Sequence, residues 1–222
     1  MICTSVNDAV QYIPPTAIAC RVLVRHSMAP SDVPNDERAL TPMGYALCHN
    51  VASDYQQLLT RLGLHFKAFN PESHTQIKCS PLPRALITAA LVTEFGRITP
   101  NPSLQLQVSI IKIDDGRQYE TWKAANMSLR DMMLAIHKNQ SLVQDQPYEQ
   151  RMAEMTNLLV GSTDRPLVIY FGHEPEATLW ALARFQIEPD EAGLAECQAY
   201  IVFTHLNGSL TTIKFCPPAT IK

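Results

Sequence analysis

Residues 19–26 read Ala-Cys-Arg-Val-Leu-Val-Arg-His, and residues 167–173 read Leu-Val-Ile-Tyr-Phe-Gly-His. Each stretch is a short, nearly continuous run of apolar and β-branched residues. Such runs are typical of strands buried on both faces of a parallel sheet. Both runs end at a histidine, His26 in one case and His173 in the other. We therefore expect two central parallel strands, each followed directly by a polar side chain.

The segments between and beside these strands carry helix and hairpin signals. Thr41 can cap a helix with its hydroxyl and Pro42 suits the first helical position, and apolar residues then recur at three and four as far as Gly63. The other expected elements are a weak strand at 77–79 ending at Ser80, a helix from Pro83 to about Gly96, a strand at 104–113, two helices within 119–160, a helix after His173, and strands at 198–204 and 209–215 that form a hairpin around Asn207-Gly208.

The alternation of strands and helices sets the expected fold class. It predicts an α/β protein with a doubly wound, mainly parallel sheet and helices on both faces. The 16 prolines are spread along the 222 residues and do not gather into a linker, which favours a single domain over 1–222. We expect its core at about 19–205, with an insertion at about 105–160.

Composition narrows the classes of partner. The net charge of -3 gives no basic field for nucleic acid, and no stretch of 18 apolar residues predicts a membrane span. The first 15 residues lack the basic start and apolar run of a secretory signal, which favours the cytoplasm. The 6 cysteines occur singly, without metal-ligand spacing, so we expect neither a disulfide framework nor a metal site.

Ligands of an open α/β sheet bind beyond the carboxyl ends of its strands. Arg25-His26, the segment from Ser80 to Arg84, and His173 all follow predicted strands, so we expect them at one edge of the sheet. Each of these residues alone would be ordinary. Together, two histidines and two arginines would form a cationic pocket that matches phosphate oxygens, with a histidine able to act as nucleophile.

Four ordered motifs carry a family resemblance. They are Val-Leu-Val-Arg-His-Ser at 22–27, Leu-Thr-Pro-Met-Gly at 40–44, Ser-Pro-Leu-Pro-Arg-Ala-Leu-Ile-Thr-Ala at 80–89, and Val-Ile-Tyr-Phe-Gly-His-Glu-Pro at 168–175. The sequence resembles the histidine phosphatase superfamily, with the phosphoglycerate mutase-like fold, and the third motif is the most specific. The resemblance implies that His26 attacks phosphorus and becomes phosphohistidine, while Arg25, Arg84 and His173 bind the phosphoryl oxygens. It implies no cofactor.

The general acid is left open. Glu174 directly follows His173, as the acid does in the acid phosphatase branch, but a glutamate in the first turn of a helix is also favoured by the helix dipole. In the mutase-like branch the acid is a mid-chain glutamate. Lys112 falls at that place here, with Asp114, Asp115 and Glu120 nearby. A third possibility is a labile leaving group that needs little acid assistance.

Three further residues are candidates for substrate binding: Ser27, Arg38 and Ser80. The stretch Asp36 to Thr41 resembles small bacterial phosphohistidine phosphatases, which would make Arg38 a phosphate or substrate contact. Ser27 stands where the family has glycine, so it could narrow the pocket or add a hydroxyl contact. The hydroxyl residue and asparagine that follow the Arg-His-Gly motif in mutases are absent, which disfavours a mutase.

The sequence thus predicts a cofactor-independent phosphatase acting on a small phosphorylated molecule or on phosphohistidine in a protein. The alternative is a degenerate protein of the same fold that binds a phosphorylated ligand without turnover. Tyr119, Trp122 and Lys123 could line a substrate pocket, although helix packing explains them equally well.

Overall fold

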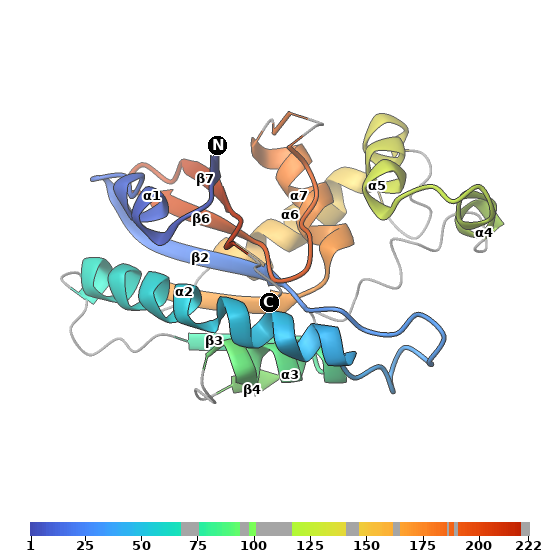
Figure 1. The fold of residues 1–222 in the computed structure, drawn as a ribbon. Helices are drawn as coiled ribbons and strands as arrows, with labels where there is room; N and C mark the ends of the chain where they lie inside the picture. Colours follow the sequence, from blue (N-terminus) through green and yellow to red (C-terminus); the bar gives the residue numbers. More distant parts are fainter. Residues whose placement is uncertain are drawn as a thin grey trace.

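The computed structural model describes residues 1–67, 76–93, 98–100, 117–140, 147–161, 165–185, 187–188 and 191–218 (Figure 1). The strands are β1 (Ile2–Cys3), β2 (Ala17–Arg25), β3 (Gln76–Cys79), β4 (Ile98–Pro100), β5 (Leu167–Gly172), β6 (Ala199–His205) and β7 (Leu210–Phe215). The helices are α1 (Val6–Gln11), α2 (Pro42–Lys67), α3 (Pro83–Val92), α4 (Arg117–Ala124), α5 (Leu129–Lys138), α6 (Tyr148–Val160) and α7 (Glu174–Phe185).

The strands form one sheet in the order β1-β7-β6-β2-β5-β3-β4. The two apolar runs that end at histidines are its centre, because β2 pairs with β5 in parallel. β3 continues the parallel part on the other side of β5, while β6 and β7 form an antiparallel hairpin beside β2. Gly208 in the hairpin turn has φ +79, a conformation that glycine adopts without strain. The mainly parallel sheet and the hairpin are confirmed.

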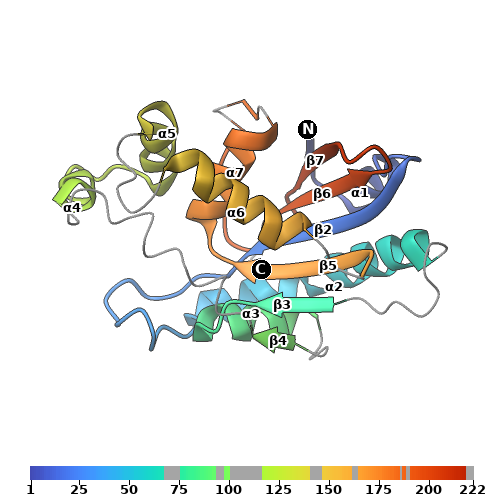
Figure 2. The ribbon, with the colours of Figure 1, turned by 180° about the vertical axis from the view of Figure 1, so that it is seen from behind.

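Helices cover both faces of the sheet, as the two views in Figures 1 and 2 show. Alternate residues of β5 explain this arrangement, since side chains along a strand point to opposite faces. Ile169 and Phe171 lie in the apolar core that includes residues of α1, α2 and α3. Val168 and Tyr170 lie in a second core that includes residues of α5, α6 and α7. The doubly wound architecture is therefore confirmed.

Helix α2 begins as expected and continues further than expected. The Thr41 hydroxyl accepts a hydrogen bond from the Gly44 N–H over 3.0 Å, and Pro42 is the first helical residue. The expected end at Gly63 is wrong, since the helix continues to Lys67. A glycine inside a helix costs only about 1 kcal/mol. Burial of Phe66 beyond Gly63 continues the apolar face and offsets that cost.

The described residues of 117–160 form three helices, whereas two are expected within 119–160. Ser128 caps α5 through the Asp131 N–H, and α6 follows Pro147, so each begins at its own start signal. The expected strand at 104–113 and the expected helix end at Gly96 lie outside the described residues; the described helix α3 ends at Val92.

The N-terminal segment forms two elements that the sequence analysis does not predict. Ser5 caps α1, and β1 pairs with β7 through Cys3 opposite Phe215. Within the described part of the chain no helix is both long and apolar enough to cross a membrane. The cytoplasmic location and the single domain over 1–222 stay predictions.

Candidate active site

Three strand ends bring the expected residues to one edge of the sheet. Arg25 of β2 lies opposite Gly172 of β5, and the neighbouring β3 is in register with the same strand. The His26 N–H then donates to the Gly172 carbonyl over 2.9 Å, and the Ser80 N–H donates to the Phe171 carbonyl over 2.9 Å. The backbone thus fixes where His26, Ser80 and His173 leave the sheet.

Arg84, in the first turn of α3, joins the two histidines. Its Nε–H donates to His26 Nε2 over 3.0 Å, and its Nη2 lies 3.2 Å from His173 Nδ1. The two imidazole rings are 5.0 Å apart at their centroids and nearly perpendicular. On its far side, His173 Nε2 lies 3.0 Å from the Ser80 hydroxyl oxygen. We call these four residues, His26, Ser80, Arg84 and His173, the histidine–arginine cluster.

The hydrogen-bond partners assign the proton on each ring. A guanidinium only donates, so the two ring nitrogens that face Arg84 must be acceptors. His26 Nδ1–H therefore donates to the Ser27 carbonyl oxygen, 2.6 Å away, and the lone pair is on Nε2. His173 carries its proton on Nε2, toward Ser80. His26 thus presents an unprotonated nitrogen toward Arg84.

Burial and neighbouring cations keep both histidines neutral. The pKa of His26 is lowered to about 3, mainly by burial and also by the charges of Arg84, Arg25 and Arg38, while the hydrogen bond to the Ser27 carbonyl opposes the shift. Burial also lowers the pKa of His173 to about 2, together with His26, Arg84 and Arg25. The pKa of Arg84 falls to about 10 through burial and through Arg38, and at neutral pH its charge persists.

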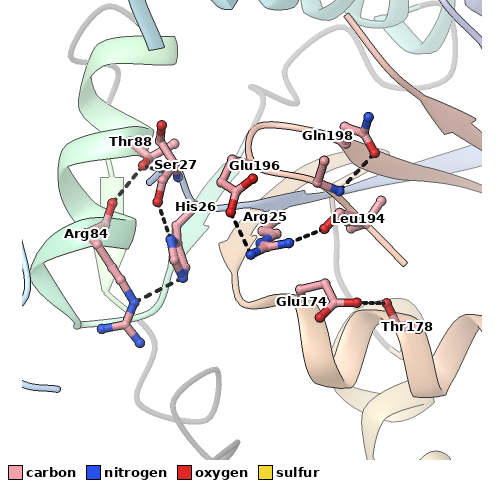
Figure 3. Close-up of polar contacts among 11 residues, drawn as sticks. Arg25, His26, Ser27, Arg84, Thr88, Glu174, Thr178, Leu194, Glu196 and Gln198 are labelled. Atoms are coloured by element: carbon pink, nitrogen blue, oxygen red, sulfur yellow. Dashed lines mark hydrogen bonds and ion pairs between the residues drawn. The ribbon is translucent and has the colours of Figure 1, made fainter. Parts of the chain in front are cut away.

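Arg25 lies on the other side of His26 and is held by the loop before β6 (Figure 3). Its Nη1 donates to the Leu194 carbonyl over 2.5 Å, and its Nη2 forms an ion pair with Glu196 Oε1 at 2.8 Å. The Arg25 side chain is not hydrogen-bonded to His26, but its charge lowers the pKa of both histidines. It is thus close enough to act on the cluster electrostatically.

Ser27 is fully buried, and its hydroxyl donates to the Gly44 carbonyl over 2.8 Å. Its N–H donates to the Thr88 hydroxyl oxygen over 3.0 Å, and that hydroxyl donates to the Arg84 carbonyl over 2.7 Å. Ser27 therefore ties the loop after β2 to α2 and α3. The hydroxyl contact to a phosphate that the sequence allowed is replaced here by the bond to Gly44.

Arg38 belongs to the loop between β2 and α2, and it is half-buried beside Arg84. Its Nε donates to the Val33 carbonyl over 2.6 Å, which shapes the loop. The Arg38 carbonyl accepts the Arg84 N–H over 3.0 Å, and the Asn35 carbonyl accepts Arg84 Nη1 over 2.9 Å. The loop therefore holds Arg84 in place, and Arg38 adds a third positive charge near the cluster.

Glu174 is the first residue of α7 and is 3% exposed. Its Oε1 accepts from the Thr178 hydroxyl over 2.9 Å, and its Oε2 has no hydrogen-bond partner. In Figure 3 its side chain extends toward Thr178 and away from His26. Burial raises the pKa of Glu174, with Arg25, Thr178 and the Leu194 amide opposing that shift and Glu196 adding to it. The Glu174 carboxyl therefore binds a proton more readily than an exposed glutamate does, and it is directed along α7 toward Thr178.

The remaining sequence candidates separate into two groups. Lys112, Asp114 and Asp115 lie outside the described residues, as do the side chains of Tyr119 and Glu120. Trp122 packs into the second apolar core and Lys123 is exposed, which favours helix packing over a substrate pocket. No group of histidine, cysteine, aspartate and glutamate residues in the described part could hold a metal ion.

Two residues near the site carried no assigned role at the sequence level. Glu196 belongs to no motif, and only the pairing of β2 with β6 brings its loop against Arg25. Thr88 lies inside the third motif, and its spacing of four from Arg84 could have indicated that they share one helix face.

Solved structures are similar to this fold over most of the chain. The phosphoserine phosphatase of Entamoeba histolytica, in complex with 3-phosphoglyceric acid, aligns with a TM-score of 0.51 at 15% identity, over 87% of this chain and 94% of that chain. A putative α-ribazole-5′-P phosphatase from Escherichia coli aligns with a TM-score of 0.52 at 13% identity, over 87% of this chain and 94% of that chain. The chain has the phosphoglycerate mutase-like fold.

Histidine phosphatases have this fold, so the fold expected from the four motifs is confirmed. A mutant of the Entamoeba histolytica phosphatase, in complex with phosphoserine, aligns equally well, with a TM-score of 0.52 at 13% identity, over 87% of this chain and 94% of that chain. At these identities the likeness establishes the fold alone. No protein-family model and no curated protein sequence matches the chain.

Proposed function

We propose that this protein is a phosphatase that hydrolyses a phosphomonoester or phosphohistidine through a phosphohistidine intermediate on His26. The proposal rests above all on the state of His26. Its Nδ1–H is held by the Ser27 carbonyl, its pKa is about 3, and its Nε2 lone pair faces the guanidinium of Arg84. A neutral histidine fixed in one tautomer beside a phosphate-binding fork is suited to nucleophilic attack on phosphorus.

Phosphoryl transfer to His26 begins when substrate oxygens accept the N–H groups of Arg84. This releases the His26 lone pair, which attacks phosphorus as the bond from phosphorus to the leaving oxygen or nitrogen breaks. The leaving group keeps that electron pair and takes up a proton from solvent. Arg25 and Arg84 stabilise the charge on the equatorial oxygens, and His173, whose Nδ1 lies 3.2 Å from Arg84 Nη2, orients the Arg84 guanidinium. Hydrolysis follows: a water oxygen attacks phosphorus, and the phosphorus–nitrogen bond breaks with its electron pair returning to His26 Nε2. One water proton leaves with the phosphate and the other passes to solvent.

The position of Glu174 bears on the substrate class. Its carboxyl is hydrogen-bonded to Thr178, away from His26, so it is poorly placed to protonate a leaving group. This favours a substrate whose leaving group departs with little acid assistance, such as phosphohistidine or an aryl phosphate. The half-buried Arg38 offers a cation for a second anionic group, and structures of the same fold hold phosphoserine or 3-phosphoglyceric acid. Small phosphorylated acids are therefore the second substrate class to test.

The alternative function is binding of a phosphorylated ligand without turnover. It is favoured by one observation: donors of both Arg25 and Arg84 are already bonded to protein groups. Turnover separates the two functions, because a binding protein would bind phosphate and yet form no covalent intermediate.

The test is to trap the intermediate. Protein treated with chelator is mixed with p-nitrophenyl phosphate or a phosphohistidine peptide and quenched in alkali, and acid-labile phosphate on the chain is counted. We expect it on the wild-type protein and on His49→Ala, in which an exposed histidine of α2 is removed, and not on His26→Ala. Equal labelling of His26→Ala would overturn the mechanism. Phosphate binding with neither labelling nor turnover would establish the alternative.

The role of Glu174 has its own test. Glu174→Gln is expected to change the rate less than threefold with p-nitrophenyl phosphate and with an alkyl phosphomonoester, because the carboxyl is directed at Thr178. A general acid contributes about 10²- to 10⁴-fold, and most with a poor leaving group. A loss of that size confined to the alkyl substrate would therefore assign Glu174 as the acid. Asp115→Asn, measured in parallel, tests the mid-chain candidate.

A further inference from the structure

The two arginines of the site differ in what neutralises them. The side-chain partners of Arg84 are the neutral rings of His26 and His173 and the backbone carbonyl of Asn35. Arg25 instead forms an ion pair with a carboxylate, Glu196, at 2.8 Å. Of these two arginines, Arg84 is therefore the one that presents an uncompensated charge to an incoming anion.

A second carboxyl adds to the compensation of Arg25. Arg25 lowers the pKa of Glu174 and Glu196 raises it, so all three groups lie within electrostatic reach of one another. Glu174 is buried, and its carboxyl accepts a hydrogen bond from Thr178. The Glu196 side chain is 28% exposed and belongs to a loop. Of the two carboxyls, Glu196 is the one that can move aside.

We propose that Glu196 acts on phosphate binding through Arg25. Its carboxylate occupies a guanidinium donor of Arg25 in the free protein, and a phosphoryl oxygen takes over that donor when substrate binds. A carboxylate oxygen and a phosphate oxygen make the same charge-assisted bond to a guanidinium, at about 2.7–2.9 Å. They also repel each other, so Glu196 weakens the hold of the site on phosphate. The consequence is faster release of the product, inorganic phosphate. This inference rests on the proposed function.

The opposite role would be support. If Glu196 served only to hold Arg25 in the correct orientation, its loss would weaken phosphate binding. The sign of the change in affinity therefore decides between the two roles, and an isosteric variant keeps the loop intact while removing the charge.

The experiment measures the Kd of inorganic phosphate by titration calorimetry for wild type, Glu196→Gln and Glu191→Gln. Glu191 is a matched control, since it is a partly exposed carboxylate of the same loop whose ion pair is with the N-terminus at 3.8 Å. We expect Glu196→Gln to bind phosphate about fivefold more tightly, the effect of removing one partly exposed charge. The KM for p-nitrophenyl phosphate should fall in parallel, and Glu191→Gln should match the wild type.

A second pair of proteins tests whether the effect passes through Arg25. Glu196→Gln is placed in the background of Arg25→Gln, with urea unfolding used to check that both variants fold. The gain in phosphate affinity should disappear, because interacting residues give non-additive effects. Weaker or unchanged binding in Glu196→Gln, or the same gain without Arg25, would overturn the inference.

Failure of the proposed function is visible separately. If phosphate binding tightens in Glu196→Gln but no phosphohistidine forms on the wild-type protein, the enzyme assignment fails and the role of Glu196 stands. If the wild-type protein turns over substrate and Glu196→Gln gains no affinity, the inference fails alone. A wild-type protein that binds no phosphate contradicts both.

Discussion

The Nε–H of Arg84 donates to Nε2 of His26 over 3.0 Å, so the proposed phosphate-binding group and the proposed nucleophilic atom are hydrogen-bonded to each other. Each satisfies the other in a buried site where an unpaired polar group would cost about 1–3 kcal/mol. A substrate phosphoryl group can replace this contact because it supplies acceptors for Arg84 and an electrophile for His26. Without substrate, the hydrogen bond between Arg84 and His26 therefore keeps both groups paired, and a phosphoryl group replaces it on binding.

Arg84→Lys is expected to lower kcat/KM at least 100-fold with p-nitrophenyl phosphate. Arg84 reaches His26, His173 and the Asn35 carbonyl through three different nitrogens, and a single ammonium cannot reproduce that fork. Steady-state kinetics and the Kd of inorganic phosphate measure the loss. Arg184→Lys is the control. Arg184 lies on α7 and forms an ion pair with Glu149 of α6 at 3.5 Å, so this substitution should change activity less than twofold. Full activity in Arg84→Lys would mean that a point charge suffices.

The two buried histidines should make the fold sensitive to acid. An unfolded histidine binds a proton below about pH 6.5, whereas His26 stays neutral in the fold down to about pH 3 and His173 down to about pH 2. The unfolded chain therefore binds more protons than the folded protein throughout this window. The contribution that the two neutral histidines make to stability is full above about pH 6.5 and is lost as the pH falls. Each histidine should contribute up to about 1.4 kcal/mol per pH unit to the free energy of unfolding.

Urea unfolding at pH 7, 6, 5 and 4 measures this slope. His173→Gln should have a shallower slope than the wild type by about one histidine, while the exposed His49→Gln should keep it. An equal slope in His173→Gln and the wild type would show that His173 is not held neutral. Protonation of His26 should not reduce activity above about pH 4, because its pKa lies near 3.

The sequence predicted the edge of the sheet where the site lies, because buried strands have a strong apolar signal and each ends at a histidine. It could not predict the partners of those residues. Which nitrogen of His26 carries the proton depends on the Ser27 carbonyl and on Arg84, two contacts made by backbone geometry and by a separate helix. The ion pair of Arg25 depends on Glu196 in a loop brought near by antiparallel pairing, for which no local signal exists.

Helix α2 illustrates the same limit on a structural feature. Its start was predicted by Thr41 and Pro42, which act locally. Its end was misjudged because Gly63 breaks no contact: a Cβ added there would meet nothing within 4 Å. The chain continues as helix for as long as its apolar face finds the core, and that depends on residues elsewhere in the fold.

Gly44 and Gly63 should therefore respond in opposite ways to alanine. A Cβ on Gly44 would come within 2.3 Å of the Met28 carbonyl oxygen, so the loop after β2 and the first turn of α2 would have to separate. We expect Gly44→Ala to destabilise the fold by about 1–3 kcal/mol and to lower activity, because the Gly44 carbonyl also holds the Ser27 hydroxyl. Gly63→Ala should raise stability by up to about 1 kcal/mol and leave activity unchanged. Urea unfolding and kinetics on both variants check this, and equal stability of the two would contradict the close approach.

Thr88 links the two halves of the candidate site and gives the sharpest test of how they are held. Its hydroxyl accepts the Ser27 N–H beside His26 and donates to the Arg84 carbonyl. Thr88→Val keeps the shape of the side chain and leaves the Ser27 N–H unpaired in a buried position, which should cost about 1–3 kcal/mol. Because the Ser27 carbonyl orients His26, kcat should also fall, while Thr93→Val should do neither. Thr93 is the matched control: its hydroxyl donates to the Ala89 carbonyl one turn back, as that of Thr88 does to the Arg84 carbonyl, but it lies at the C-terminal end of α3, away from Arg84 in the first turn. If both variants lose the same stability and neither loses kcat, the bond to Ser27 contributes nothing to orienting His26.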